Sequence, residues 1–440
     1  MKELEYPFDA AYIIKKRKSL KKALLADGTS RIRKKIAVFG GSTTSDIVKT
    51  LELFLLDAGI EPEFYESEYA QYFQDAMFPD ETLLSFKPDI VFIHTTNRNV
   101  TDWPEMTDTT EQIDEKLHTE INRFTAMWKS IAEKFHCPII QNNFEMPLYR
   151  LLGSRDAWDI HGRTNFLTRL NEAFYAYARE NESFYIHDLN FVSADYGLKE
   201  WSNPLFWNMY KYAMCFEAIP SFAFSVSHII KSIFGKNKKA LALDLDNTLW
   251  GGVVGDDGVD GIEIGQETGV SQSYYEFQTY VKQLKSLGIV LTVCSKNDHE
   301  NAIAGLNHPE GALRPDDFVI IKANWENKDR NIAETAAELN ILPDSIVFAD
   351  DNPAEREIVR TQIKGAAVPD MDGVENYITT IDRSGFFEVT TFSEDDLKRN
   401  EMYKKNALRA AEMASFGDYN DYLKSLEMHA VIDDFIPVYL

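Results

Sequence analysis

The segment 238–252 constrains the fold most strongly, because a short apolar run ends there in two closely spaced carboxylates. It reads Lys-Lys-Ala-Leu-Ala-Leu-Asp-Leu-Asp-Asn-Thr-Leu-Trp-Gly-Gly. An apolar run bounded by lysines and glycines is typical of a buried parallel strand. Side chains alternate along a strand, so Asp244 and Asp246 would point to the same side at its carboxyl end. Open α/β sheets bind ligands at that edge, and two acids so close together need a cation.

Three later apolar runs repeat the pattern. They cover residues 289–295, 317–321 and 345–349. The first ends in Ser295, the second precedes a helical stretch that opens at Lys328, and Asp350 and Asp351 follow the third. One helix-length segment separates successive runs, which is the rhythm of a doubly wound parallel sheet. The sequence therefore predicts that acids, hydroxyls and a lysine meet at one edge of this sheet.

These side chains suit phosphoryl transfer. Carboxylate oxygens hold Mg²⁺, which neutralises phosphate charge, and a lysine adds a fixed positive charge. One aspartate can attack phosphorus in line, and a second can then move the proton. The hydroxyls of Thr248 and Ser295 can donate hydrogen bonds to the phosphoryl group.

Four motifs at these strand ends resemble those of the haloacid dehalogenase (HAD) superfamily of phosphatases and phosphotransferases. In chain order they are Asp244-x-Asp246-x-Thr248, Ser295, Lys328 and Asp350-Asp351. The resemblance implies that Asp244 is the nucleophile and Asp246 the general acid and base. The implied Mg²⁺ ligands are Asp244, Asp246, Asp350 and Asp351. The residues implied to bind the phosphoryl group are Thr248, Ser295, Asn297 and Lys328, and the catalytic residues are Asp244, Asp246, Ser295 and Lys328.

Longer stretches resemble the FkbH-like branch of this superfamily, of the subfamily IIIC type. They cover residues 243–258, 293–297, 324–328 and 350–356. The resemblance implies an enzyme that takes a glyceryl unit from 1,3-bisphosphoglycerate, holds it as a thioester, removes its phosphate and passes it to an acyl carrier protein. The expected partners are therefore a phosphorylated small molecule and an acyl carrier protein.

The predicted phosphoryl-transfer domain has no room for a lid domain of its own. Between the first two motifs the chain holds only a glycine-rich flap, residues 251–269, and one helix, residues 270–287. Another domain, or a docked protein that carries the substrate, would then have to close the site. One alternative is a capless phosphatase of small metabolites, and another is a non-catalytic assembly module.

Cys294 allows two interpretations. It adjoins Ser295, so it could carry the acyl group as a thioester if a nearby cation lowered its pKa. Strand alternation favours the other interpretation, because a crevice-facing Ser295 turns Cys294 toward the flanking helices. We therefore favour a buried structural cysteine.

The first half of the chain also has the pattern of an α/β domain. Apolar runs near residues 35–39, 89–93 and 138–140 each lead into polar residues. Their order resembles an SGNH-hydrolase-like domain, which implies Ser42 as nucleophile and Asn97 in the oxyanion hole. This chain has Gly40-Gly41-Ser42 where that family has Gly-Asp-Ser, and it lacks the Asp-x-x-His base. We therefore favour a binding or scaffolding domain over an esterase.

The composition and the N-terminus indicate where the protein is located and which partners it does not bind. The 440 residues carry a formal net charge of −24, which argues against binding to nucleic acid or to an anionic membrane surface. Three cysteines provide no disulfide framework. The N-terminus lacks the apolar core of a signal peptide, so we expect a cytoplasmic protein.

The fold class expected overall is α/β, with two Rossmann-like three-layer α/β/α domains and a helical C-terminal extension. The predicted segments are a basic amphipathic helix in 1–30, the SGNH-like domain in 31–235, the capless HAD-like domain in 236–390 and the extension in 391–440. Residues 431–440 resemble the first strand of an acetyltransferase-like domain. Such a strand would mean that the natural chain continues or that the tail pairs elsewhere.

Overall fold

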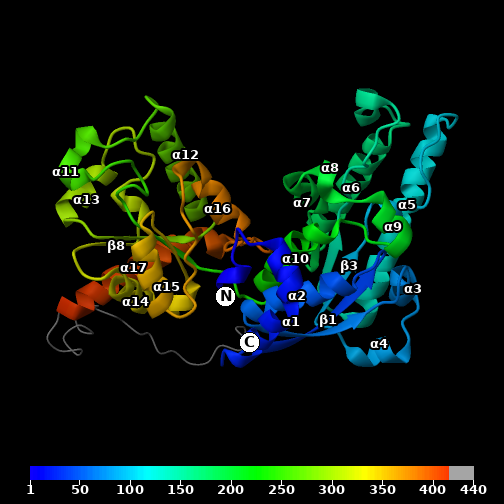
Figure 1. Ribbon diagram of the computed structural model, residues 1–440, viewed down its shortest axis with the longest axis horizontal. Coiled ribbons are helices and arrows are strands. Elements are labelled where there is room, and N and C mark those ends of the chain that lie inside the picture. The colour runs from blue at the N-terminus through cyan, green and yellow to red at the C-terminus, as the bar shows by residue number, and fades with distance from the viewer. Residues whose placement is uncertain (416–440) are drawn as a thin grey trace, which may run out of the picture. The chain divides into compact units, whose positions relative to one another are not determined.

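The computed structural model describes residues 1–415 and divides the chain into two compact units. Unit 1 comprises Met1–Asn237 with Glu388–Thr390, and unit 2 comprises Lys238–Phe387 with the residues from Thr391 onward. Each unit is built around its own parallel sheet (Figure 1).

Unit 1 contains a five-stranded parallel sheet with the strand order β2-β1-β3-β4-β5. Its strands are β1 (Ile32–Gly40), β2 (Ile60–Glu66), β3 (Ile90–His94), β4 (Ile139–Asn142) and β5 (Phe184–His187). Its α-helices are α1 (Ala10–Ala26), α2 (Ser45–Asp57), α3 (Tyr72–Met77), α4 (Glu81–Phe86), α5 (Thr110–Phe135), α6 (Arg163–Glu180), α7 (Leu189–Tyr196), α8 (Leu198–Trp201), α9 (Pro204–Tyr210) and α10 (Ile219–Ile233). Its 3₁₀ turns are η1 (Lys2–Leu4), η2 (Asn97–Asn99), η3 (Gly153–Ala157) and η4 (Phe216–Ala218).

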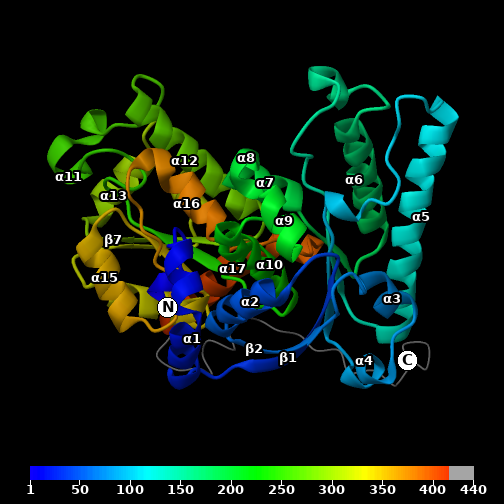
Figure 2. The same cartoon turned by 45° about the vertical axis from the view of Figure 1, so that its right-hand side comes forward.

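Alternating residues of β1 divide the core of unit 1 into two layers. Ile36 and Val38 pack with α1, α2 and α10 on one face of the sheet. Ala37 and Phe39 pack with α3, α5 and α6 on the other. Helices α5 and α6 lie side by side in this second layer (Figure 2). Residues 36–40 of β1 are all buried, with alternate side chains on opposite faces, as a sheet covered by helices on both faces requires.

Unit 2 contains a four-stranded parallel sheet with the order β8-β7-β6-β9. Its strands are β6 (Ala240–Leu243), β7 (Val290–Ser295), β8 (Ile320–Ala323) and β9 (Ile346–Ala349). Its α-helices are α11 (Val254–Asp257), α12 (Gly269–Ser286), α13 (His299–Leu306), α14 (Lys328–Glu338), α15 (Pro353–Gln362), α16 (Tyr377–Arg383) and α17 (Glu394–Ser415). Its 3₁₀ turns are η5 (Val259–Gly261), η6 (Pro315–Asp317), η7 (Pro343–Ser345) and η8 (Val374–Asn376).

Strand β6 organises the core of unit 2 in the same way. Leu241 and Leu243 pack toward α12, α13 and α16. Ala240 and Ala242 pack toward α14 and α15. Both units are therefore three-layer α/β/α folds, as predicted.

The third predicted strand of unit 2 begins later than expected. Residues 315–317 form η6 instead, and β8 starts at Ile320. The reason is Asp317, which accepts hydrogen bonds from the Arg314 N–H at 2.9 Å and from Lys285 Nζ at 2.7 Å. These contacts fix a turn where the apolar pattern alone predicts a strand.

The predicted C-terminal extension begins with helix α17, which belongs to unit 2. The Asp396 N–H donates to Ser393 Oγ, and the Ser393 N–H donates to Asp396 Oδ2 at 2.8 Å, which caps the helix at its N-terminus. Residues 416–440, with the strand expected at 431–440, lie outside the described residues. Within residues 1–415, no helix combines the length and the apolar character needed to cross a membrane.

Candidate active site

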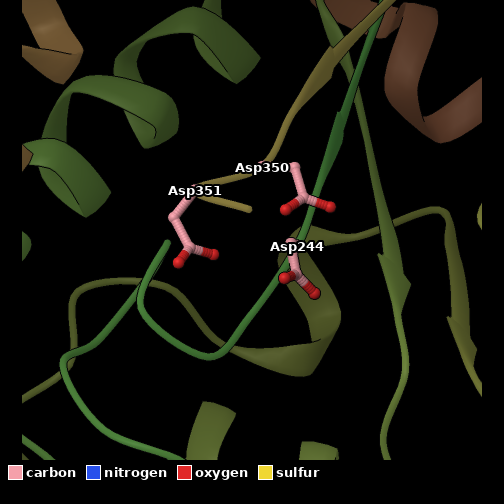
Figure 3. A group of neighbouring side chains, drawn as sticks. All are labelled: Asp244, Asp350 and Asp351. Atoms are coloured by element: carbon pink, nitrogen blue, oxygen red, sulfur yellow. The ribbon is translucent and has the colours of Figure 1, made fainter. Parts of the chain in front are cut away.

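Three carboxylates from two neighbouring strands meet at the carboxyl edge of the unit 2 sheet. Asp244 follows β6, and Asp350 and Asp351 follow β9, its parallel neighbour. The Asp244 N–H donates to the Ala349 carbonyl at 3.0 Å, which brings the two strand ends together. One carboxylate oxygen from each aspartate lies within 4.8 Å of the others (Figure 3). An all-oxygen group of this kind fits Mg²⁺, which prefers hard oxygen ligands.

Burial concentrates negative charge in this group. Asp350 is fully buried, and desolvation followed by the charge of Asp244 raises the pKa of its carboxyl. The same two causes raise the pKa of Asp351. A divalent cation would relieve this repulsion, so the electrostatics of the group also fit a metal.

Lys328 supplies a buried positive charge beside the acids. It is the first residue of α14 and is 3% exposed. Its Nζ lies 2.9 Å from Asp244 Oδ2 and 2.6 Å from Asp350 Oδ2. Burial alone would lower the pKa of Lys328, but the charges of the two aspartates outweigh burial and raise it. Lys328 therefore stays protonated at neutral pH.

Asp246 lies outside the group of three neighbouring carboxylates, and its role as a metal ligand stays a prediction. Its Oδ1 accepts the Trp250 Nε1–H at 2.9 Å and the Val254 N–H at 3.0 Å, and its Oδ2 accepts from Asn297 Nδ2 at 3.0 Å. These three contacts engage both carboxyl oxygens of Asp246. Burial raises the pKa of Asp246, which favours the protonated form that a general acid needs.

The predicted phosphate-binding residues all lie at the same sheet edge. Thr248 is fully buried, and its Oγ1 accepts the Asp351 N–H at 3.2 Å. Ser295 ends β7 and is 1% exposed, and its carbonyl accepts the Asn324 N–H at 3.1 Å. Asn297 is also buried, and its amide donates to Asp246. Asn297 is thus engaged with the candidate general acid.

Cys294 is buried behind this edge. It is 1% exposed and belongs to the core cluster between the sheet and helices α14 and α15. Its Sγ lies 3.6 Å from the Lys328 carbonyl. Burial raises the pKa of the thiol well above its ordinary value. A thiol in this position is a poor nucleophile, which favours the structural interpretation.

Arg356 is a site residue that sequence reasoning missed. It lies on α15, is 4% exposed, and its Nη1 donates to the main-chain carbonyls of Asp350 at 3.0 Å and Asp351 at 2.7 Å. An arginine in the first turns of a helix that directly follows two acids is the signal that could have found it.

The two residues predicted for a site in unit 1 also lie at the carboxyl edge of its sheet. Ser42 follows β1 and is 1% exposed, and its Oγ has no hydrogen-bond partner among the described residues. Asn97 opens η2 after β3, and its N–H donates to Glu145 Oε2 at 3.2 Å. The edge thus carries polar groups, but none of them activates Ser42 in the described part of the chain.

Two buried histidines of unit 1, His94 and His187, are engaged with Asn142. His94 Nδ1 lies 2.7 Å from Asn142 Nδ2, and His187 Nδ1 lies 2.8 Å from Asn142 Oδ1. Burial lowers the pKa of each imidazole to about 3. Both rings are therefore neutral parts of a buried polar chain.

Comparisons with known proteins agree with this arrangement. The family model "FkbH, N-terminal domain" matches residues 35–231. The chain is 30% identical to the N-terminal part of a Bacteroides fragilis protein that contains a phosphatase domain and was crystallised with Mg; the match covers 86% of this chain and 99% of that one, with a TM-score of 0.78. A candidate acylhydrolase from Bacteroides fragilis is 17% identical over 50% of this chain and 97% of its own, with a TM-score of only 0.28. None of the curated proteins matches.

The first of these structures decides the family. Its 30% identity extends over almost its whole length, and the family model independently matches unit 1 of this chain. The motifs at the edge of the unit 2 sheet lie outside the family-model match and agree with the phosphatase domain of that structure. The chain therefore belongs to the FkbH-like family of the HAD superfamily.

Proposed function

We propose that this protein is a Mg²⁺-dependent phosphoryl-transfer enzyme of the HAD type. The observation that carries the proposal is the group of the buried Asp244 and Asp350 with the half-buried Asp351, in which Lys328 contacts Asp244 and Asp350. The Bacteroides fragilis relative, which contains a phosphatase domain complexed with Mg, supports the same activity.

Asp244, Asp350 and Asp351 would hold the metal ion. Bound Mg²⁺ supplies charge neutralisation for a phosphoryl group and fixes its orientation. Lys328 already neutralises part of the acidic charge and would add a second positive charge next to the transferring group.

Asp244 is the proposed nucleophile. Its carboxylate oxygen forms a bond to phosphorus while the bond from phosphorus to the leaving oxygen breaks, and Asp246 gives its proton to that oxygen. Asp246 then takes a proton from water, the water oxygen bonds to phosphorus, and the bond to Asp244 breaks. The three donors around Asp246 hold its carboxyl in one orientation for both transfers.

The substrate that we propose is a phosphoglyceryl group derived from 1,3-bisphosphoglycerate, with the glyceryl unit delivered to an acyl carrier protein. Two considerations support it. The resemblance to the FkbH-like branch implies this substrate. The short segments between the motifs of unit 2, which hold only α11, η5 and α12 before β7, leave closure of the site to another domain or protein.

A plain phosphatase of small metabolites is the second candidate. The burial of Cys294 favours it, because a thiol that is 1% exposed cannot receive an acyl group without opening of the core. Acyl transfer would then require another thiol, either from a partner or from another cysteine of this chain.

Phosphate release tests the activity. We expect Mg²⁺-dependent release from a phosphorylated substrate by the wild-type protein, little release by Asp244→Asn, and wild-type release by the control Asp260→Asn on the exposed turn η5. Equal turnover in the wild type and in Asp244→Asn would show that Asp244 is not the nucleophile.

Intact mass tests the substrate. The protein is incubated with Mg²⁺ and 1,3-bisphosphoglycerate and is then treated with hydroxylamine, which cleaves thioesters. A labile glyceryl adduct that disappears in Cys294→Ala would establish acyl transfer on this chain. Phosphate release without an adduct would support the plain phosphatase.

A further inference from the structure

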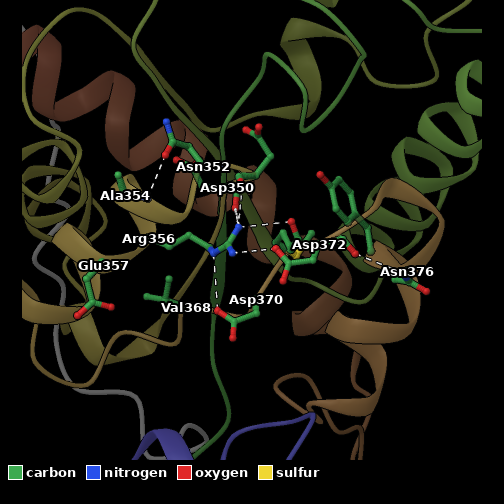
Figure 4. Close-up of polar contacts among 12 residues, drawn as sticks. Asp350, Asn352, Ala354, Arg356, Glu357, Val368, Asp370, Asp372 and Asn376 are labelled. Carbon is green, nitrogen blue, oxygen red and sulfur yellow. Dashed lines mark hydrogen bonds and ion pairs between the residues drawn. The ribbon is translucent and has the colours of Figure 1, made fainter.

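Arg356 links the two acids after β9 to a second segment of unit 2. Its Nη1 donates to the carbonyls of Asp350 and Asp351, and its Nη2 donates to Asp372 Oδ1 at 3.0 Å (Figure 4). Nη1 also lies 3.4 Å from the Met371 carbonyl. We propose that Arg356 is a positioning residue that presets the carboxylates of Asp350 and Asp351 for Mg²⁺, an inference that rests on the proposed function.

The contacts of Arg356 leave the metal-binding atoms free for the metal. The guanidinium binds the main-chain oxygens of Asp350 and Asp351, whereas Lys328 binds the carboxyl oxygens of Asp244 and Asp350. A metal ion would compete with Lys328 for those carboxyl oxygens. It would not compete with Arg356, which can hold the two peptide units in one orientation with or without the metal.

Other contacts complete the orientation of the acidic turn. Asp350 Oδ1 accepts the Asn352 N–H at 2.8 Å, and the Asp351 N–H donates to Thr248 Oγ1 at 3.2 Å. Asn352 also caps α15, on which Arg356 lies, by accepting the Ala354 N–H at 2.9 Å. Arg356 therefore closes a short loop of contacts that runs from the acids into the helix and back to their carbonyls.

The planar fork of arginine suits this role better than a lysine would. Its guanidinium carries five N–H donors in fixed directions, so one group can bind two carbonyls and a carboxylate at once. A lysine would carry the same charge but lacks this planar set of fixed donors. Residues that orient metal ligands change metal affinity by about 10–100-fold when they are replaced.

Arg360 offers a matched control on the same helix. It lies one turn farther along α15 and binds the Val368 carbonyl at 2.8 Å and Asp370 Oδ1 at 3.0 Å. It thus fastens α15 to the segment before Asp372 without the hydrogen bonds that Arg356 makes to the acidic turn. A purely structural role for α15 predicts similar effects of the two arginines on metal binding.

Isothermal titration with Mg²⁺ tests the proposal on the full-length protein. We expect Arg356→Met to weaken Mg²⁺ binding by about 10–100-fold, Arg356→Lys to fall between it and the wild type, and Arg360→Met to stay within about twofold. Thermal unfolding without Mg²⁺ checks that each variant is folded. If Arg356→Met does not fold, the Mg²⁺ affinity of Arg356→Lys alone is compared with that of the wild type. Turnover of Arg356→Lys should recover at saturating Mg²⁺.

Two results would overturn the proposal. One is wild-type Mg²⁺ affinity in a folded Arg356 variant, and the other is an equal loss in Arg360→Met. If the wild-type protein itself bound no Mg²⁺, the proposed function would fail as well. If the wild type bound Mg²⁺ and turned over substrate, and the Arg356 variants bound Mg²⁺ with the same affinity, only this inference would be overturned.

Discussion

The ammonium nitrogen of Lys328 lies 2.6 Å from Oδ2 of Asp350, and both side chains are buried. Lys328 thus neutralises part of the negative charge of the acidic group. Removing it leaves Asp244 and Asp350 buried without their cation, which costs about 3–5 kcal/mol of folding free energy when one partner of a buried ion pair is removed.

We expect Lys328→Met to be destabilised strongly without Mg²⁺ and much less with saturating Mg²⁺, because the metal replaces the missing charge. Urea unfolding under both conditions measures this difference. Lys322→Met is the control, since Lys322 on β8 pairs with the half-buried Glu334 and the exposed Glu338, and losing these pairs should cost little stability. An equal loss of stability in Lys328→Met with and without Mg²⁺ would contradict the prediction.

The role of Asp246 predicts a dependence on the leaving group. Asp246→Asn cannot give a proton to the departing oxygen, so hydrolysis of an alkyl phosphate should fall by about 10²–10⁴-fold. p-Nitrophenyl phosphate releases a stable anion without protonation and should be affected far less in its first step. Burst kinetics with both substrates measure that step. The same loss for both would show that Asp246 is not the general acid.

Cys294 should be chemically silent in the folded protein. It is 1% exposed and burial raises the pKa of its thiol, so the reactive thiolate is scarce. We expect a thiol reagent such as dithionitrobenzoate to modify Cys294 only after unfolding, as mapped by mass spectrometry. Rapid modification of Cys294 in the native protein would reopen the thioester interpretation.

Glu145 in unit 1 predicts a loss of stability as the pH rises from about 5 to about 8. Burial raises the pKa of its carboxyl to about 8, so the folded protein holds a proton that the unfolded chain has lost. The contribution is fully present below the ordinary pKa of glutamate and disappears as pH rises through about 8.

Glu145→Gln should remove this pH dependence. We expect the free energy of unfolding of the wild type to fall relative to Glu145→Gln by up to about 1.4 kcal/mol for each pH unit between about pH 5 and pH 8. Urea unfolding at three pH values measures it. A difference between the two proteins that does not change with pH would mean that Glu145 titrates normally.

The sequence predicts the central strands and the ends that carry the acids, because buried strands leave continuous apolar runs. It misses β2 and β5, which are the edge strands of unit 1. Residues such as Glu61 and Glu63 interrupt the apolar pattern of β2, since an edge strand is covered less completely.

The candidate site, too, could be predicted from the sequence only in part. Adjacent strands place Asp244 beside Asp350 and Asp351, which strand order and motif spacing allow one to predict. The orientation of the Asp246 carboxyl depends on Trp250 and on the main-chain N–H of Val254 in the flap. The motif spacing predicts neither contact. Sequence reasoning therefore finds which residues gather but not which way each of them points.

The central claim is that Asp244 forms a bond to phosphorus. The most direct measurement is acid quenching of the protein during turnover of p-nitrophenyl phosphate with Mg²⁺, followed by digestion and mass spectrometry of the phosphorylated peptide. We predict an acyl phosphate on Asp244 that is absent from Asp244→Asn. Continued turnover in Asp244→Asn, or a phosphoryl group on another residue, would contradict this account.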